Sequence, residues 1–137
     1  MSFNEDITYS AVTGDFQISA VPEILDSADC NRVLWAYCLR IENNSDKPIC
    51  LLKRNFCITD NHGRNYYDCG QGFHNELPDL QPGEYYEFED TAVIEGQAAV
   101  LYGYCTAVDS DGTETRIKLP FISLNLSAEK SGKISDN

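Results

Sequence analysis

Apolar and polar residues alternate along much of the chain, which is the pattern of β-strands with one buried face. The alternation is clearest in F-Q-I-S-A-V over 16–21 and in V-L-W-A-Y-C-L-R-I over 33–41. It returns over 85–89, 98–108 and 115–126, and Asn, Asp, Gly and Pro residues separate the runs. No run has the period of a helix. The pattern therefore predicts an all-β chain of about eight short antiparallel strands.

Short strands separated by turns are typical of a two-layer β-sandwich with an immunoglobulin or fibronectin type III-like layout. Positions of one parity in a strand share a face, so one face of 33–41 is expected in the core. Pro22 is expected to end the first strand, and the polar residues 53–55 interrupt the run 48–59, which predicts a bulged strand that changes sheets. The predicted core residues are Trp35, Tyr37, Leu39, Ile41, Phe88 and Ile117.

Length and composition predict one soluble domain. The chain has 137 residues, 42% of them hydrophobic, and no run of about 20 apolar residues, so neither a membrane span nor a membrane partner is expected. The sandwich is expected over 15–126, between a flexible N-terminal tail (1–14) and a disordered C-terminal tail (127–137). The first residues show no basic stretch followed by an apolar run, so no signal peptide is expected and the predicted location is cytoplasmic.

Acidic residues outnumber basic ones, which limits the kinds of partner. Ten Lys and Arg stand against 22 Asp and Glu, giving a net charge of −12. Because binding to a phosphate backbone depends on cations, nucleic acid is not expected as a partner. An acidic surface keeps a protein soluble, and it attracts basic partners and divalent cations weakly.

The cysteines are expected to be free thiols, because a reducing cytosol does not maintain disulfides. No C-x-x-C pair occurs in the sequence, and most of the cysteines lie in strand-like runs, where a thiol usually packs as a small apolar side chain. Cys69 lies beside glycine in a loop-like stretch and is expected to be exposed. The six positions are Cys30, Cys38, Cys50, Cys57, Cys69 and Cys105.

The stretch Asp68–Gly83 is the candidate binding loop. It holds three glycines and two prolines in sixteen residues, a composition that gives a loop a defined shape. Phe73 and His74 have no strand period to bury them, so both are expected to face outward, where an aromatic side chain can anchor a partner. The competing hypothesis is that Phe73 folds back and closes the end of the sandwich.

Several ordered motifs resemble the ApaG family, also called DUF525. They are L-L-K-R-N-F-C-I-T-D-N-H-G over 51–63, G-Q-G-F-x-x-E-x-P-x-L-x-P-G over 70–83, D-S-D-G over 109–112 and L-P-F-I-S-L over 119–124. The resemblance covers residues 15–126, and Asn75 stands where the family has the third glycine of G-x-G-x-x-G. Positions that match the family are Arg54, Asp60, Gly63, Gly70, Gly72, Glu76, Pro78, Leu80, Pro82 and Gly83.

The resemblance implies a fibronectin type III-like sandwich of the free-standing bacterial type. It implies no established enzyme activity, an association with cobalt resistance and magnesium efflux, and, from eukaryotic relatives, a role in protein binding. The family's S-G and T-P-x-G signatures are replaced in this chain by Asp90-Thr91 and the residues 96–99, so the chain resembles a divergent member.

Other chemistries find little support in the sequence. A dinucleotide fingerprint needs a helix after its glycines, and Pro78 and Pro82 prevent one, although backbone amides with Lys53 and Arg54 could hold an anion. No serine lies in G-x-S-x-G, and no catalytic residue is expected. Neither a metal nor another cofactor is expected, because the potential ligands lack ligand spacing. These potential ligands are Asp60, His62, Asp68, Cys69 and His74.

The sequence therefore predicts a noncatalytic protein-binding module that presents the Gly/Pro-rich loop to a partner, as a monomer or a homodimer. The alternative is a protein that binds a small anion, such as phosphate or pyrophosphate, or a divalent cation in ion homeostasis. The predicted contact residues are Arg54, Gly70, Gly72, Phe73, His74 and Pro78.

Overall fold

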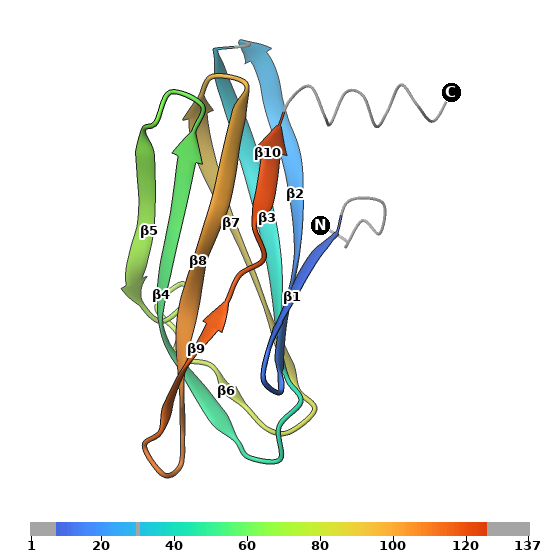
Figure 1. Ribbon diagram of the computed structural model, residues 1–137, viewed down its shortest axis with the longest axis vertical. Helices are drawn as coiled ribbons and strands as arrows, with labels where there is room; N and C mark the ends of the chain where they lie inside the picture. Colours follow the sequence, from blue (N-terminus) through green and yellow to red (C-terminus); the bar gives the residue numbers. More distant parts are fainter. Residues whose placement is uncertain (1–7, 30, 126–137) are drawn as a thin grey trace, which may run out of the picture.

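Two antiparallel sheets pack face to face in the computed structural model, which describes residues 8–29 and 31–125 (Figure 1). No helix in these residues could cross a membrane. The described residues form ten strands: β1 (Tyr9–Thr13), β2 (Phe16–Asp29), β3 (Arg32–Asn43), β4 (Ile49–Asp60), β5 (Asn65–Gln71), β6 (Asp79–Leu80), β7 (Tyr85–Glu95), β8 (Ala98–Asp109), β9 (Glu114–Lys118) and β10 (Ile122–Asn125).

The four-stranded sheet has the order β1-β2-β3-β7, and the six-stranded sheet has the order β10-β8-β4-β5, with β6 paired to β4 and β9 paired to β8. Every strand pair is antiparallel. The predicted all-β antiparallel sandwich is confirmed. The long strands β3 and β4 both lie inside their sheets; β3 is almost continuously buried, whereas β4 mostly alternates between buried and half-buried positions.

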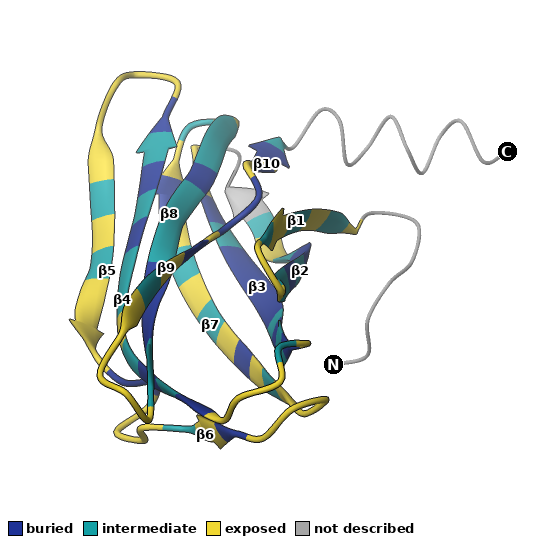
Figure 2. Ribbon diagram, turned by 60° about the horizontal axis from the view of Figure 1, so that its bottom comes forward, coloured by how far each residue is buried: buried dark blue, intermediate teal, exposed yellow. Residues whose placement is uncertain are grey.

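The predicted core is confirmed at all six positions. Trp35, Tyr37, Leu39, Ile41, Phe88 and Ile117 are each 2% exposed or less. The register places Leu39 opposite Phe88, so the apolar faces of β3 and β7 point the same way, toward the six-stranded sheet. Figure 2 shows β3 almost wholly buried, whereas β5, at the edge of its sheet, is mainly exposed.

The N-terminal boundary differs from the prediction. The expected tail 1–14 contains β1, which pairs with β2 from Thr13 opposite Phe16 to Tyr9 opposite Ala20. A strand of five residues carries too short a pattern to be recognised alone, and its conformation depends on this pairing. The expected C-terminal tail 127–137 lies outside the described residues.

Two strand predictions also change. The first long strand does not end at Pro22 but continues to Asp29. Pairing with β1 stops at Ala20, so Pro22 lies where β2 is an edge strand and a missing N–H is tolerated. In β4, the register shifts between Leu51 and Lys53, which confirms the predicted bulge, but β4 stays in the six-stranded sheet and does not change sheets.

Candidate functional site

The predicted loop is a tight hairpin rather than an open loop. Phe73 N–H donates to the carbonyl of Glu76 (2.8 Å), and Glu76 N–H donates to the carbonyl of Phe73 (2.9 Å). The two residues between them, His74 and Asn75, have φ angles of 49° and 67°. Two successive left-handed residues characterise the hairpin turn that matches strand twist, and Asn tolerates this conformation better than most residues. Asn75 can therefore replace the family's glycine.

Phe73 closes the end of the core. It is 0% exposed, so the prediction that it faces outward is wrong, and the competing hypothesis describes its position. Its ring packs edge-on against Phe88, with centroids 5.0 Å apart, and against Tyr86 at 5.6 Å. Phe56 lies 6.4 Å away on the opposite sheet. A side chain held in this way fixes the hairpin but cannot reach a partner.

The loop glycines make room for neighbouring groups. Gly72 has φ of 66°, its N–H donates to the carbonyl of Leu52 (2.6 Å), and a Cβ there would lie 2.1 Å from the carbonyl oxygen of Glu76. Gly70 lies beside the Arg54 guanidinium, which would be 3.6 Å from an added Cβ. Gly72 therefore has a structural reason to be glycine, whereas a Cβ at Gly70 would make only an ordinary contact.

Arg54 points between the sheets and holds the loop. Its Nε donates to Asp68 (2.9 Å) and its Nη1 donates to the carbonyl of Gly72 (2.6 Å). The second oxygen of Asp68 accepts a hydrogen bond from Tyr37 (3.0 Å), and burial, reinforced by the Asp68 charge, raises the pKa of this phenol. The Arg54 and Asp68 side chains are only 18% and 25% exposed. Arg54 is thus committed to a structural ion pair.

The other predicted contact residues, His74 and Pro78, have contacts of their own. His74 is exposed, its Nε2 is 2.8 Å from the carbonyl oxygen of Glu89, and its ring lies 4.6 Å from that of Phe88. The Pro78 carbonyl accepts the N–H of Leu51 (2.9 Å). Pro78 also lines an open hollow of about 480 Å³ beside β6 and β7. The structure therefore brings together Arg54, Gly70 and Gly72, and it places His74 on the Phe88 ring, whose centroid lies 5.8 Å from the Arg54 guanidinium. Pro78 lies elsewhere, beside β4 and β6.

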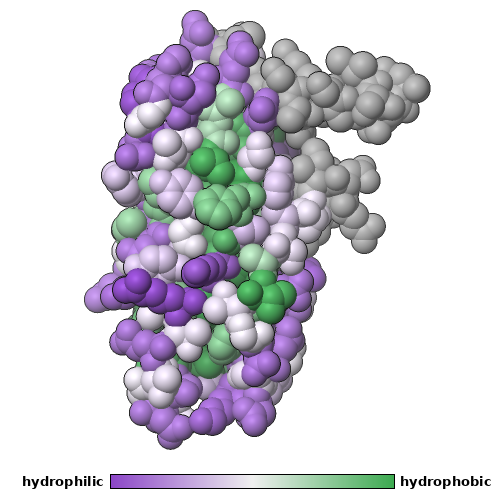
Figure 3. Space-filling model, in the orientation of Figure 1, coloured by the Kyte–Doolittle hydropathy of each residue, from purple (hydrophilic) through white to green (hydrophobic). Residues whose placement is uncertain are grey.

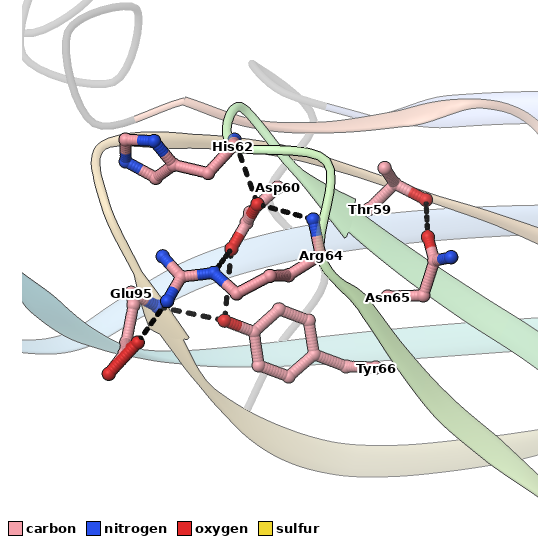
Figure 4. Close-up of polar contacts among 7 residues, drawn as sticks. All are labelled: Thr59, Asp60, His62, Arg64, Asn65, Tyr66 and Glu95. Atoms are coloured by element: carbon pink, nitrogen blue, oxygen red, sulfur yellow. Dashed lines mark hydrogen bonds and ion pairs between the residues drawn. The ribbon is translucent and has the colours of Figure 1, made fainter.

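A second polar cluster joins the two sheets at the turn after β4 (Figure 4). One oxygen of the buried Asp60 accepts the N–H groups of His62 (2.8 Å) and Arg64 (2.9 Å), and the other accepts Arg64 Nε and the Tyr66 hydroxyl, both at 3.0 Å. The Arg64 guanidinium also forms an ion pair with Glu95 on β7. Burial alone would raise the pKa of Asp60, but these hydrogen bonds outweigh it and lower the pKa to about 2. The D-x-x-G motif therefore has a structural role: it fixes the turn after β4 and links this turn to β7.

The arrangement of the described residues does not support the predicted alternative of a metal or anion site. Within the described residues, no group of three or more His, Cys, Asp or Glu side chains could hold a metal ion. Lys53 and Arg54 are neighbours on β4, and because Arg54 points between the sheets, Lys53 points to the outer face. The two cations therefore do not form one anion site.

The outer face of the six-stranded sheet carries exposed aromatic side chains that the sequence analysis missed. Tyr67 lies opposite Cys57, and Cys57 lies opposite Tyr102. Phe121 precedes β10, and its ring lies 5.9 Å from that of Tyr102. Tyr67 and Phe121 are 71% and 73% exposed. We call this surface the aromatic face; its outward side chains are Asn55, Cys57, Thr59, Asn65, Tyr67, Cys69, Val100, Tyr102, Tyr104 and Phe121.

One end of the aromatic face is cationic. Lys118 on β9 lies opposite Tyr104. One row further along the sheet, Lys53 on β4 and Arg116 on β9 flank the same residue of β8, Thr106. The guanidinium of Arg116 lies 4.7 Å from the Tyr104 ring centroid. Figure 3 views this side of the molecule: green and pale residues lie in the middle of the view, below and beside purple residues at the top, and a band of dark purple residues crosses below them. We call Lys53, Arg116 and Lys118 the cationic end.

No local signal marks this surface in the sequence. Tyr67, Tyr102 and Phe121 lie on three separate segments, and only the register of β5, β4, β8 and β10 places them on one face. Each is an ordinary strand aromatic when taken alone.

The fold and its hairpin define a small β-sandwich with a Gly-rich turn tied to the sheet by a buried arginine. The ApaG domain (DUF525) matches residues 25–109, and the chain belongs to the ApaG family. It is 35% identical to protein ApaG of Methylocella silvestris over 85% of this chain and 92% of that protein. It is 36% identical to protein ApaG of Shewanella pealeana over 77% of this chain and 82% of that protein.

Solved structures agree on the fold. The putative ApaA protein from Bordetella pertussis superposes with a TM-score of 0.76, at 21% identity, over 88% of this chain and 97% of that one. The predicted resemblance to the ApaG family is confirmed by the family match and by the two relatives above.

Proposed function

We propose that the chain is a noncatalytic protein-binding module whose contact surface is the aromatic face. The observation that supports this most is the pair of aromatic side chains, Tyr67 and Phe121, that are more than 70% exposed on the outside of a sheet. Large exposed aromatic groups are costly to leave in water, and they are the side chains that most often anchor protein interfaces.

The scaffold favours binding because the side chains of the aromatic face are already held. The Tyr102 hydroxyl lies 3.0 Å from that of Thr59, which in turn donates to Asn65 (2.7 Å). The ring contact between Tyr102 and Phe121 adds to this order. Preorganised side chains lose little conformational entropy when a partner binds.

A noncatalytic role fits the surroundings of the two histidines. His74 contacts a backbone carbonyl and the ring of Phe88, and the backbone N–H of His62 bonds to Asp60. In the part of the chain that the structure describes, neither histidine is bonded to a cysteine or a serine, as an activated nucleophile would require. The association with cobalt resistance and magnesium efflux stays a prediction.

The test is the double change Tyr67→Ser with Phe121→Ser, followed by capture of the native partner from the cells that make the protein. We expect capture to be lost while the thermal midpoint changes by only a few degrees, because both side chains are mostly in solvent. Tyr85→Ser is the matched control, since Tyr85 is 53% exposed on the other sheet.

A second control separates the aromatic face from the loop. Leu77 is 54% exposed and lies behind the hairpin. If Leu77→Ser abolishes capture and the aromatic double variant does not, the partner binds the loop and this proposal is wrong.

A further inference from the structure

Among the described residues, the cations that make no ion pair are concentrated on one surface. In the described part of the chain, the ion pairs use Arg40, Lys47, Arg54 and Arg64. Four other Lys and Arg side chains make no ion pair there, and three of these form the cationic end of the aromatic face; the fourth is Arg32. On a chain of net charge −12, this distribution sets the aromatic face apart from the rest of the surface.

In the described strands, no carboxylate lies between the aromatic side chains and the cationic end. None of the outward positions of the aromatic face or of its cationic end is Asp or Glu, although the chain has 22 of them. The next outward position beyond Arg116 on β9 is Glu114, so a partner's carboxylates coming from the aromatic side would meet the three cations before this acid. Because exposed charges act over only about 8–10 Å at physiological salt, this local balance counts for more than the net charge.

The strand geometry sets the spacing of a fitting ligand. Residues two apart in a strand are about 7 Å apart, the distance between successive rows of the face. One row contains Tyr102, the next contains Tyr104 and Lys118, and the row after that contains Lys53 and Arg116. An extended segment lying along β8 would repeat with this spacing and pass between β4 and β9.

We infer that the aromatic face binds an extended acidic segment of the partner protein, with an apolar side chain over Tyr102 and Phe121 followed at alternate positions by carboxylates near Lys118 and near Lys53 and Arg116. This inference rests on the proposed function, and it adds the chemistry of the partner. Single-stranded nucleic acid also pairs aromatic and cationic groups, but the large negative charge around the face repels a long polyanion more than a short acidic segment.

The test uses short fluorescein-labelled peptides and fluorescence anisotropy. The probe carries one Phe followed at alternate positions by Asp and Glu; matched peptides carry Asn and Gln, or Lys, at the acidic positions. We expect binding of the acidic peptide alone, weakened by added salt. The triple change Lys53→Gln, Arg116→Gln, Lys118→Gln should weaken it about tenfold or more. The control Arg32→Gln, Arg40→Gln, Lys47→Gln removes the same charge elsewhere and should retain binding.

Several results would overturn the inference. These are no binding of the acidic peptide, equal binding of the Asn/Gln peptide, equal loss in both triple variants, or tighter binding of a labelled oligothymidine that the first triple variant abolishes. If the acidic peptide fails while Tyr67→Ser with Phe121→Ser still abolishes capture of the native partner, only the partner chemistry is wrong. If that double variant keeps its partner, the proposed function itself fails.

Discussion

Phe73 shows how two backbone angles decide the role of a side chain. The left-handed conformations of His74 and Asn75 reverse the chain and turn the Phe73 ring into the core. The adjacent His74 stays at the surface. Two neighbours in one loop therefore have different functions, and the ring that looked like a binding anchor is a core residue.

Replacing Phe73 by Ala should lower the free energy of unfolding by about 3–5 kcal/mol, because an aromatic-sized cavity would remain among Phe56, Tyr86 and Phe88. Urea unfolding measures this. The control His74→Ala loses one exposed hydrogen bond and should cost about 1 kcal/mol. Equal costs for the two variants would contradict the buried position of Phe73.

The buried Asp60 makes the free energy of unfolding depend on pH in the acidic range. Its pKa is lowered to about 2 in the folded chain, against about 3.9 for an unfolded Asp, so its contribution is fully present above about pH 4 and is lost as pH falls through about 2. Urea midpoints measured from pH 7 to pH 2 should fall less steeply below pH 4 in Asp60→Asn, which should also be less stable at pH 7. The exposed Asp111→Asn should follow the unmodified protein.

Strand pairs account for both the successes and the failures of sequence analysis. The core could be predicted because alternation along β3 fixes which face Trp35 and Leu39 share. The extent of β2 and the existence of β1 could not, because they depend on pairing between separate segments. The aromatic face was missed for the same reason, and Phe73 because its direction depends on a turn whose left-handed residues are not glycine.

The β4–β8 pair depends on a close backbone approach at Gly103. This residue has φ of 133°, and a Cβ there would lie 2.1 Å from the carbonyl oxygen of Asn55. Gly103→Ala should cost about 3 kcal/mol or more, because the two strands must separate or the backbone must distort. Thermal unfolding is the measurement. Gly112→Ala is the control: its φ is 83° but nothing lies within 4 Å, so about 1–2 kcal/mol is expected.

The thiols report on the integrity of the whole sandwich. Five cysteines in the described residues are free, as predicted, and Cys30 lies outside them. Cys69 is exposed, whereas Cys105 is buried in the core and burial raises its pKa to about 12. Iodoacetamide should modify Cys69 in the native protein, and Cys105 only after denaturation, as peptide mass spectrometry would show. Rapid native modification of Cys105 would mean that the core opens readily.

The aromatic face is assembled from two separate stretches of the chain, residues 53–69 and 98–121, so the proposed recognition requires synthesis past residue 121. The strands β4 and β5 bring Lys53 and Tyr67 early, whereas β8 and the segments after it bring Tyr102, Arg116 and Phe121 last. A ribosome that stops before residue 98 would release a product with half of the surface and without the strand that pairs with β4. If the aromatic face is the contact surface, as proposed, such a product would not compete for the partner, and the fraction of partner bound would report only chains that extend past residue 121.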